Sequence, residues 1–213
     1  MAAPFLDRSD AGRQLAAALR HYAGRPEVMV VALPRGGVPV GYEIARELHI
    51  PLDILLVRKL GVPGHRELAM GAIASGGVKV LNRDVVGLLG ISPQVIEQVA
   101  RREQRELERR ERAYRDDRPP LDVYGQTVIL TDDGLATGSS MRAAVEAMRQ
   151  KGAARIVVAV PVAAKATCAE FEVDEMICLE TPDDFRAVGE WYYDFSQTSD
   201  AKVRKLLKRA LVS

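Results

Sequence analysis

Two adjacent acids, Asp132 and Asp133, directly follow a run of apolar residues in the stretch VILTDDGLATGSSM, which spans 128–141. A helical pattern begins shortly after them, and the N-terminus of a helix favours an anion. Small residues whose backbone N–H groups can be approached closely lie between the acids and this helix: Ala136, Thr137, Gly138, Ser139 and Ser140. The Thr and Ser side chains also offer hydroxyl groups. This loop therefore suits a phosphate group.

The acid pair suits a different part of the same ligand. Two carboxylates cannot bind the phosphate that the neighbouring loop binds, because like charges repel. They suit neutral hydroxyl groups or a metal ion, so a ribose 5-phosphate fits both halves of the motif. The alternative is a strand end, a turn and a helix start that bind no ligand.

The elements that must position this motif alternate between strand and helix, which predicts an α/β fold with a parallel sheet flanked by helices. In such sheets ligands bind at the carboxyl ends of the strands. The predicted strands are 28–33, 52–57, 127–131, 155–160 and 175–179, and the predicted helices are 9–22, 38–48, 140–150 and 164–171. A hairpin is predicted from 70–74 and 78–81, on either side of Ser75-Gly76-Gly77.

A charged segment at 82–120 interrupts this alternation, and it contains a predicted helix at 93–117. Acids precede arginines by four residues along this helix, the favourable order, and a thin apolar stripe remains at Val95, Val99, Leu107 and Tyr114. We expect a solvated helix lying on the domain. A self-association surface is the alternative, and nucleic-acid binding is the least favoured interpretation because the acids neutralise the arginines.

The composition fits one domain, or a domain with a small appendage, since the chain has 213 residues of which 47% are hydrophobic. A net charge of +1 gives no indication of a nucleic-acid or membrane partner. No apolar run approaches the ~20 residues of a membrane span, and no secretory signal is visible. We therefore expect a cytoplasmic protein.

The cysteines and histidines predict no metal cluster. Cys168 and Cys178 form no CxxC motif, and His21, His49 and His65 are scattered along the chain. We expect two buried, reduced thiols.

The stretch VILTDDGLATGSS resembles the signature of type I phosphoribosyltransferases that binds phosphoribosyl pyrophosphate (PRPP). The resemblance implies that Asp132 and Asp133 hold the ribose 2- and 3-hydroxyl groups, directly or through Mg²⁺, and that 136–140 hold the 5-phosphate. It implies a five-stranded parallel core at 1–180 with the helical insertion at 82–120, and a small C-terminal hood at 181–213.

Two further segments support the resemblance. In LPRGGVPVG (33–41), Arg35, Gly36 and Gly37 correspond to the family's pyrophosphate loop, which commonly holds a cis peptide, here Pro34–Arg35 or Arg35–Gly36. In VRKLGVPGHRELAMG (57–71), Arg58 and Lys59 correspond to an Arg-Lys strand end that contacts pyrophosphate. The Gly/Pro-rich loop that follows resembles a mobile lid with His65, Arg66 and Glu67 on it. A plain solvated loop is the alternative for these lid residues.

The aromatic tail corresponds to the family's hood, which contacts the acceptor. Phe185, Trp191 or Tyr192 could stack on a planar substrate, although a small aromatic core is the alternative. Hypoxanthine–guanine members have an acid where Ala136 stands, so a carboxylate-assisted purine reaction is doubtful.

The resemblance implies transfer of a phosphoribosyl group from Mg²⁺–PRPP to a nitrogen nucleophile such as a nucleobase, with Asp132, Asp133, Lys59 and Arg35 as catalytic residues. A PRPP sensor without turnover is the alternative, and so is chemistry on another ribose phosphate. Dimers are common in the family, which leaves a homodimer open.

Overall fold

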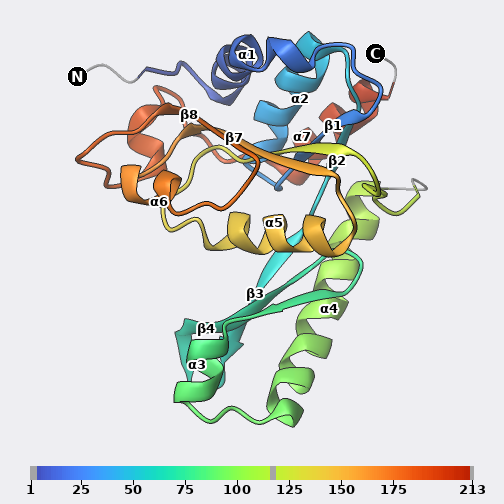
Figure 1. Ribbon diagram of the computed structural model, residues 1–213. Coiled ribbons are helices and arrows are strands. Elements are labelled where there is room, and N and C mark those ends of the chain that lie inside the picture. Colours follow the sequence, from blue (N-terminus) through green and yellow to red (C-terminus); the bar gives the residue numbers. More distant parts are fainter. Residues whose placement is uncertain (1–3, 116–118, 212–213) are drawn as a thin grey trace.

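The computed structural model describes residues 4–115 and 119–211. Five parallel strands form the central sheet in the order β2–β1–β6–β7–β8 (Figure 1). They are β1 (Val28–Ala32), β2 (Leu52–Ile54), β6 (Thr127–Thr131), β7 (Arg155–Val162) and β8 (Glu175–Glu180). The predicted α/β fold with a parallel five-stranded sheet is confirmed.

Helices cover both faces of the sheet because alternate side chains of each strand point to opposite faces. In β6, Ile129 packs with α1 (Arg8–Ala18), α2 (Gly37–Leu48) and α7 (Asp200–Ala210). Val128 and Leu130 instead pack with α5 (Ser139–Gln150), on the face that also carries α6 (Lys165–Ala169). The core is therefore split into two apolar layers, one on each side of the sheet.

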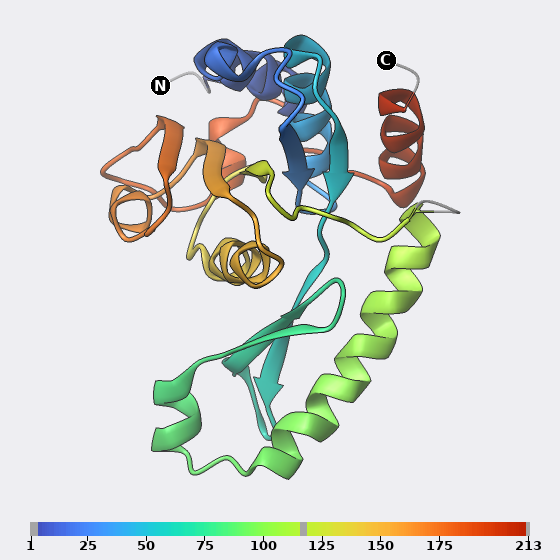
Figure 2. The same cartoon turned by 45° about the vertical axis from the view of Figure 1, so that its right-hand side comes forward.

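A second, antiparallel sheet projects from this core as an arm, residues 57–115 (Figures 1 and 2). It contains β3 (Val57–Val62), β4 (His65–Ala74) and β5 (Val78–Leu81), followed by α3 (Arg83–Leu88) and the long helix α4 (Pro93–Arg115). Apolar side chains of α4, such as Val99 and Leu107, belong to the same buried cluster as Leu60 and Met70 of the arm's sheet.

The arm corrects two predictions. The segment 57–71 is not a Gly/Pro-rich lid loop but the hairpin β3–β4, with Gly64 at its turn in a left-handed conformation (φ 81°). His65, Arg66 and Glu67 therefore lie in a strand, although the side chains of the last two are outside what the structure describes. The predicted hairpin at 70–81 is confirmed as β4–β5.

The charged helix α4 is observed as predicted up to Arg115, and positions 116 and 117 of the prediction lie outside the described residues. Ion pairs with i,i+4 spacing join Glu97 to Arg101 and Glu106 to Arg110. The helix α3, whose N-cap is Asn82, was not predicted. None of the described helices combines the length and the apolar character needed to cross a membrane.

Candidate functional site

The acid pair lies at the carboxyl end of β6, directly against the glycine loop that follows β1. A Cβ atom built on Gly36 would lie 2.0 Å from Oδ2 of Asp133, and one on Gly37 would lie 2.9 Å from Cα of Asp132. Both distances are too short for any side chain. The two glycines are therefore required by the close approach of two segments that are almost 100 residues apart in the sequence.

The backbone of the glycine loop bears out one of the two predicted cis bonds, at Pro34–Arg35. The loop leads straight into α2, since the N–H of Gly37 donates to the carbonyl oxygen of Leu33 (3.0 Å). The Arg35 side chain is 40% exposed and lies 3.7 Å from a carboxylate oxygen of Asp200, the first residue of α7.

Burial raises the pKa of both acids, and the effect is larger for Asp132, whose pKa is raised further by the negative charge of Asp133. Hydrogen bonds from the N–H groups of Asp133 and Gly37 partly offset the rise for Asp132. For Asp133, the positive charge of Arg8 partly offsets the rise in pKa.

Arg8 is a site residue that the sequence analysis missed. Its Nε donates to Oδ2 of Asp133 at 2.8 Å, and the two side chains are only 11% and 17% exposed. It stands at the start of α1, 125 residues before its partner. No local pattern distinguishes it from the other arginines of the chain, so only the three-dimensional structure could reveal it.

The N-terminal segment and the tail together hold Arg8 in place. The backbone N–H of Tyr193 donates to the carbonyl oxygen of Phe5 at 2.8 Å, and that of Asp194 donates to the carbonyl oxygen of Leu6 at 2.9 Å. The Tyr192 hydroxyl donates to the backbone carbonyl oxygen of Asp133 at 2.6 Å. The acid pair is thus supported from the tail as well as from the glycine loop.

The predicted phosphate loop connects the acid pair to α5. Gly138, in a left-handed conformation (φ 69°), is the N-cap of this helix and provides no side-chain cap. The hydroxyl-bearing side chains of Thr137, Ser139 and Ser140 lie at this helix start, and all three residues are exposed. A helix N-terminus with nearby hydroxyl groups is a favourable position for a phosphate.

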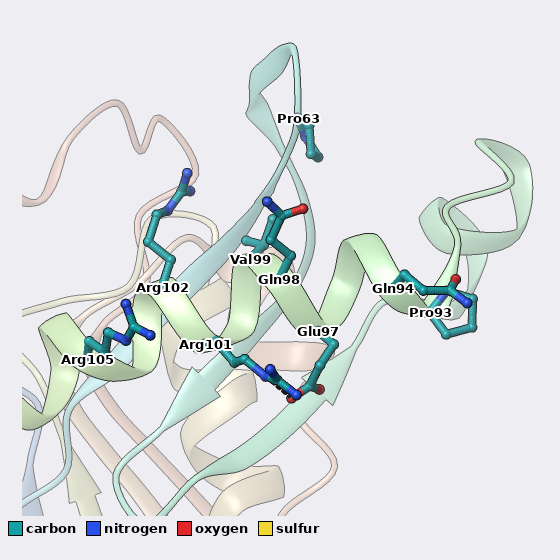
Figure 3. Close-up of a pocket in the computed structure, with 9 residues that line it drawn as sticks. All are labelled: Pro63, Pro93, Gln94, Glu97, Gln98, Val99, Arg101, Arg102 and Arg105. Atoms are coloured by element: carbon teal, nitrogen blue, oxygen red, sulfur yellow. Dashed lines mark hydrogen bonds and ion pairs between the residues drawn. The ribbon is translucent and has the colours of Figure 1, made fainter.

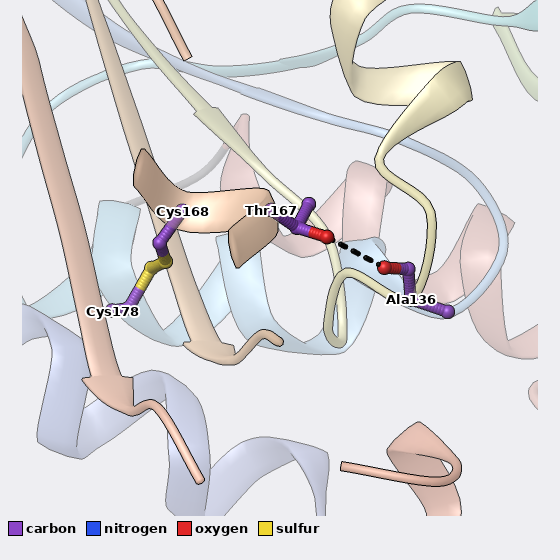
Figure 4. Close-up of a disulfide and its surroundings, with 4 residues drawn as sticks. All are labelled: Ala136, Thr167, Cys168 and Cys178. Carbon is purple, nitrogen blue, oxygen red and sulfur yellow. Dashed lines mark hydrogen bonds between the residues drawn. A yellow bond between two sulfur atoms is a disulfide. The ribbon is translucent and has the colours of Figure 1, made fainter. Parts of the chain in front are cut away.

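The helix α6 fixes this loop from the far side. Thr167 donates from its hydroxyl to the carbonyl oxygen of Ala136 at 2.9 Å (Figure 4). A Cβ atom on Gly138 would lie 2.9 Å from a methyl carbon of Thr167 and 3.0 Å from the ring of Phe171. The loop is therefore packed against α6 and the residue Phe171 that follows it.

The next residue of α6 overturns a prediction. Cys168 forms a disulfide with Cys178 of β8 (Figure 4). The expectation of two reduced thiols is wrong, and the reason is spatial, because α6 follows β7 and packs beside the neighbouring strand β8. Spacing along the sequence, which ruled out a CxxC motif, does not report this proximity.

Comparisons with known proteins agree with this geometry. A family model described as the phosphoribosyl transferase domain matches residues 6–196. The chain belongs to this family. Two Mycobacterium tuberculosis proteins, from strains CDC 1551 / Oshkosh and H37Rv, both named "putative phosphoribosyl transferase", are 46% identical over 208 residues. The match covers 97% of this chain and 47% of theirs, so the chain spans about half the length of these relatives.

Solved structures show the same fold. The crystal structure of the protein TT1426 from Thermus thermophilus is 42% identical, with a TM-score of 0.84, and the match covers 96% of this chain and 98% of that one. A hypothetical protein from Neisseria gonorrhoeae with bound ppGpp is 14% identical, with a TM-score of 0.51, over 95% of this chain and 92% of that one. The second likeness shows the fold alone.

Arg58 and Lys59 of this phosphoribosyl transferase domain do not lie at the end of a core strand as predicted, because β2 ends at Ile54. They lie near the start of β3 in the arm, on its two opposite faces. Arg58 pairs with Glu103 at 2.7 Å, on the side of β3 that faces α4. Val57 packs against the cluster that contains α5, so the alternation of the strand turns Lys59 toward that same side. Lys59 is exposed. Only Lys59 of the two is thus available to a ligand in this conformation.

The aromatic residues of the tail form a small core of their own, as the alternative interpretation had it. Tyr192 is buried with Phe5, and Phe185 and Trp191 pack partly buried against this pair. Burial raises the pKa of Tyr192, whose hydroxyl already donates to the backbone carbonyl oxygen of Asp133. By contrast, Tyr193 is 86% exposed.

A divalent cation fits the acid pair only as a site shared with a substrate. Among the residues that the structure describes, no group of three His, Cys, Asp or Glu side chains could hold a metal ion. Mg²⁺ is usually held by one or two carboxylates together with phosphate oxygens and water. Asp132 and Asp133 supply carboxylate oxygens of this kind and so fit a Mg²⁺ that arrives with a phosphorylated ligand.

A separate groove of about 870 Å³ lies on the arm, between the β3–β4 turn at Pro63 and one face of α4 (Figure 3). Three arginines line it: Arg101, Arg102 and Arg105. Arg101 pairs with Glu97, and Arg102 pairs with Glu103. The groove is on the helix that the family resemblance did not account for, and it does not include the acid pair.

Proposed function

We propose that this chain binds Mg²⁺–PRPP and transfers its phosphoribosyl group to a nitrogen nucleophile, with release of pyrophosphate. The observation that carries the proposal is the contact of Asp132 and Asp133 with the Gly36-Gly37 loop, at the sheet edge where the loop 136–140 enters α5. Membership of the phosphoribosyl transferase family supports the general activity.

Each part of the site has a role in this proposal. The loop 136–140 anchors the 5-phosphate through backbone N–H groups and hydroxyls, and so aligns the reacting carbon. Asp132 and Asp133 accept hydrogen bonds from the ribose hydroxyls, and their negative charge favours the positive charge that develops on the ribose. The loop 35–37 and Lys59 bind the departing pyrophosphate. When bound, Mg²⁺ supplies further charge stabilisation to that leaving group.

The acceptor is a nitrogen base of unassigned identity. Ala136 provides no carboxylate beside the loop, so the loop does not deprotonate the acceptor. Tyr192 is engaged by the backbone of Asp133, so we assign it to the support of the acid pair rather than to stacking on a planar acceptor. Trp191 and Phe185 support the tail rather than contact the base.

Calorimetric titration with PRPP, with and without Mg²⁺, tests the binding step. The wild type should bind PRPP more tightly with Mg²⁺, and the double variant Asp132→Asn/Asp133→Asn should lose this binding. The single variant Arg101→Gln, on the arm, is the control and should bind as the wild type does. A folded wild type that does not bind PRPP would refute the proposal.

Assays of pyrophosphate release over a panel of nucleobases then separate an enzyme from a PRPP sensor. Two observations favour the sensor as the second candidate. The arginine-lined groove of Figure 3 offers an output surface. Asp200 links the two regions, because it lies near Arg35 and accepts a hydrogen bond from Tyr114 of α4 at 2.6 Å. Tight PRPP binding without turnover on any base would favour this candidate.

A further inference from the structure

The guanidinium group of Arg8 is held on three sides. Its Nε donates to Oδ2 of Asp133, and its Nη1 donates to the backbone carbonyl oxygen of Ser196, each at 2.8 Å. The ring of Phe195 lies under it, with 3.9 Å from Cζ of Arg8 to the ring centroid. Hydrogen bonds to two acceptors and stacking on a ring leave this side chain little freedom.

The position of Arg8 on its own helix is unfavourable. It is the first residue of α1, where the helix dipole disfavours a cation, and its side chain is only 11% exposed. The N-cap of α1 is already satisfied by Asp7, which accepts from the N–H of Asp10 at 2.8 Å. The needs of the helix therefore do not explain a nearly buried arginine here, whereas the charge of Asp133 does.

Arg8 also limits what Asp133 can do. Oδ2 of this carboxylate contacts the guanidinium of Arg8 and is also its atom nearest to Gly36, where a Cβ atom would lie 2.0 Å away. One oxygen, Oδ2, is used by Arg8, just as Oδ1 of Asp132 is used by the N–H of Asp133. The orientation of the pair is thus set before a ligand arrives, which lowers the entropic cost of binding.

Building on the proposed function, we propose that Arg8 is a positioning residue for the ribose. It fixes the carboxylate of Asp133 and offsets its charge, so that the acid pair presents preformed acceptors to the neighbouring hydroxyl groups of a ribose phosphate. Arg8 acts through the acid pair and does not itself contact the ribose. The binding of a phosphate group at the loop 136–140 does not depend on it.

Two probes test this separation: ribose 5-phosphate, which carries the hydroxyl groups, and inorganic phosphate, which does not. Both are titrated without added divalent metal. Arg8→Gln should weaken ribose 5-phosphate binding at least about tenfold, the usual size of a lost charge-assisted hydrogen bond, and leave phosphate binding within about twofold. Arg8→Lys, which keeps the charge but lacks the Nε donor, should show a smaller loss with the same selectivity. Arg13→Gln on the same helix is the matched control and should change neither.

Several outcomes would overturn the role of Arg8. If Arg8→Gln binds ribose 5-phosphate as the wild type does, Arg8 does not position the acid pair. If it binds more tightly, Arg8 competes with the ligand for Asp133. An equal loss for both probes would reduce Arg8 to a structural residue. If Arg8→Gln does not fold, Arg8→Lys decides by the same criterion of selective loss. A folded wild type that binds neither probe would overturn the proposed function and this inference together.

Discussion

Replacing Gly36 with alanine should disrupt the acid pair without straining the backbone. Gly36 has φ −62° and ψ −37°, which alanine adopts readily. The added methyl group would, however, lie 2.0 Å from Oδ2 and 2.5 Å from Cγ of Asp133. The carboxylate must therefore move, and its 2.8 Å bond to Arg8 is lost or weakened.

The size of the effect follows from that bond. A hydrogen bond to a charged group contributes about 1.5–3 kcal/mol. Alanine recovers about 0.4–1 kcal/mol by restricting the unfolded chain. The net loss is about 1–2 kcal/mol, which corresponds to a fall in Tm of about 2–8 °C for a chain of this size. We also expect PRPP binding by Gly36→Ala to fall at least about tenfold.

Gly87→Ala is the matched control for thermal unfolding and calorimetry. Gly87 lies in the exposed helix α3, and a Cβ atom there would contact nothing within 4 Å. This variant should keep the wild-type affinity and gain about 0.5–1 kcal/mol of stability. If Gly36→Ala melts and binds PRPP as the wild type does, the close contact between the glycine loop and Asp133 is not part of the site.

Three further predictions concern other parts of the molecule. Lys59→Gln should weaken the binding of pyrophosphate and leave Tm unchanged. Arg58→Gln should instead lower the free energy of unfolding by about 1–2 kcal/mol, because a partly buried ion pair is lost, and should leave pyrophosphate binding unchanged. The reverse pattern in melts and titrations would contradict the assignment of the two residues to opposite faces of β3. Folding raises the pKa of Asp132, so its ionised form destabilises the folded chain and the free energy of unfolding should increase as the pH falls through the raised pKa. Asp132→Asn should therefore raise Tm at neutral pH while abolishing PRPP binding. Melts of this variant that show no gain above the wild type would argue against this. Thiol alkylation should label Cys168 and Cys178 only after reduction, and reduction should cost about 2–3 kcal/mol in denaturant unfolding; labelling of the untreated protein would show that the pair is not joined.

The sequence predicts those features that depend on neighbouring residues. The five strands, the hairpin 70–81 and the charged helix follow from local apolar periodicity, and the acid pair and the loop 136–140 follow from one contiguous motif. The resemblance to the family added the cis bond beside Arg35. Each of these features is encoded within a few consecutive residues.

The features that sequence analysis missed depend on how the elements pack, which no local pattern reports. Arg8 has a role only because α1 starts beside the end of β6. The disulfide requires α6 and β8 to be adjacent. Arg58 and Lys59 are adjacent in the sequence, but the pleat of β3 places their side chains on opposite faces of the strand. Glycine and proline in 60–64 suggested a loop, but tertiary packing on α4 favours a hairpin.

The distribution of the site along the chain has a consequence for how it is made. The acid pair is completed by Arg8 near one end of the sequence and by the Phe195 ring and the Ser196 carbonyl near the other, 188 residues from Arg8 to Ser196. Contacts of such high sequence separation form late, because loop closure must come first. A growing chain can therefore build most of its sheet, its glycine loop and the loop 136–140 while the support under Arg8 is still missing. The support under the acid pair is therefore complete only once both ends of the chain have joined the core, so ligand binding at the candidate site would report that residues 5–196 have come together.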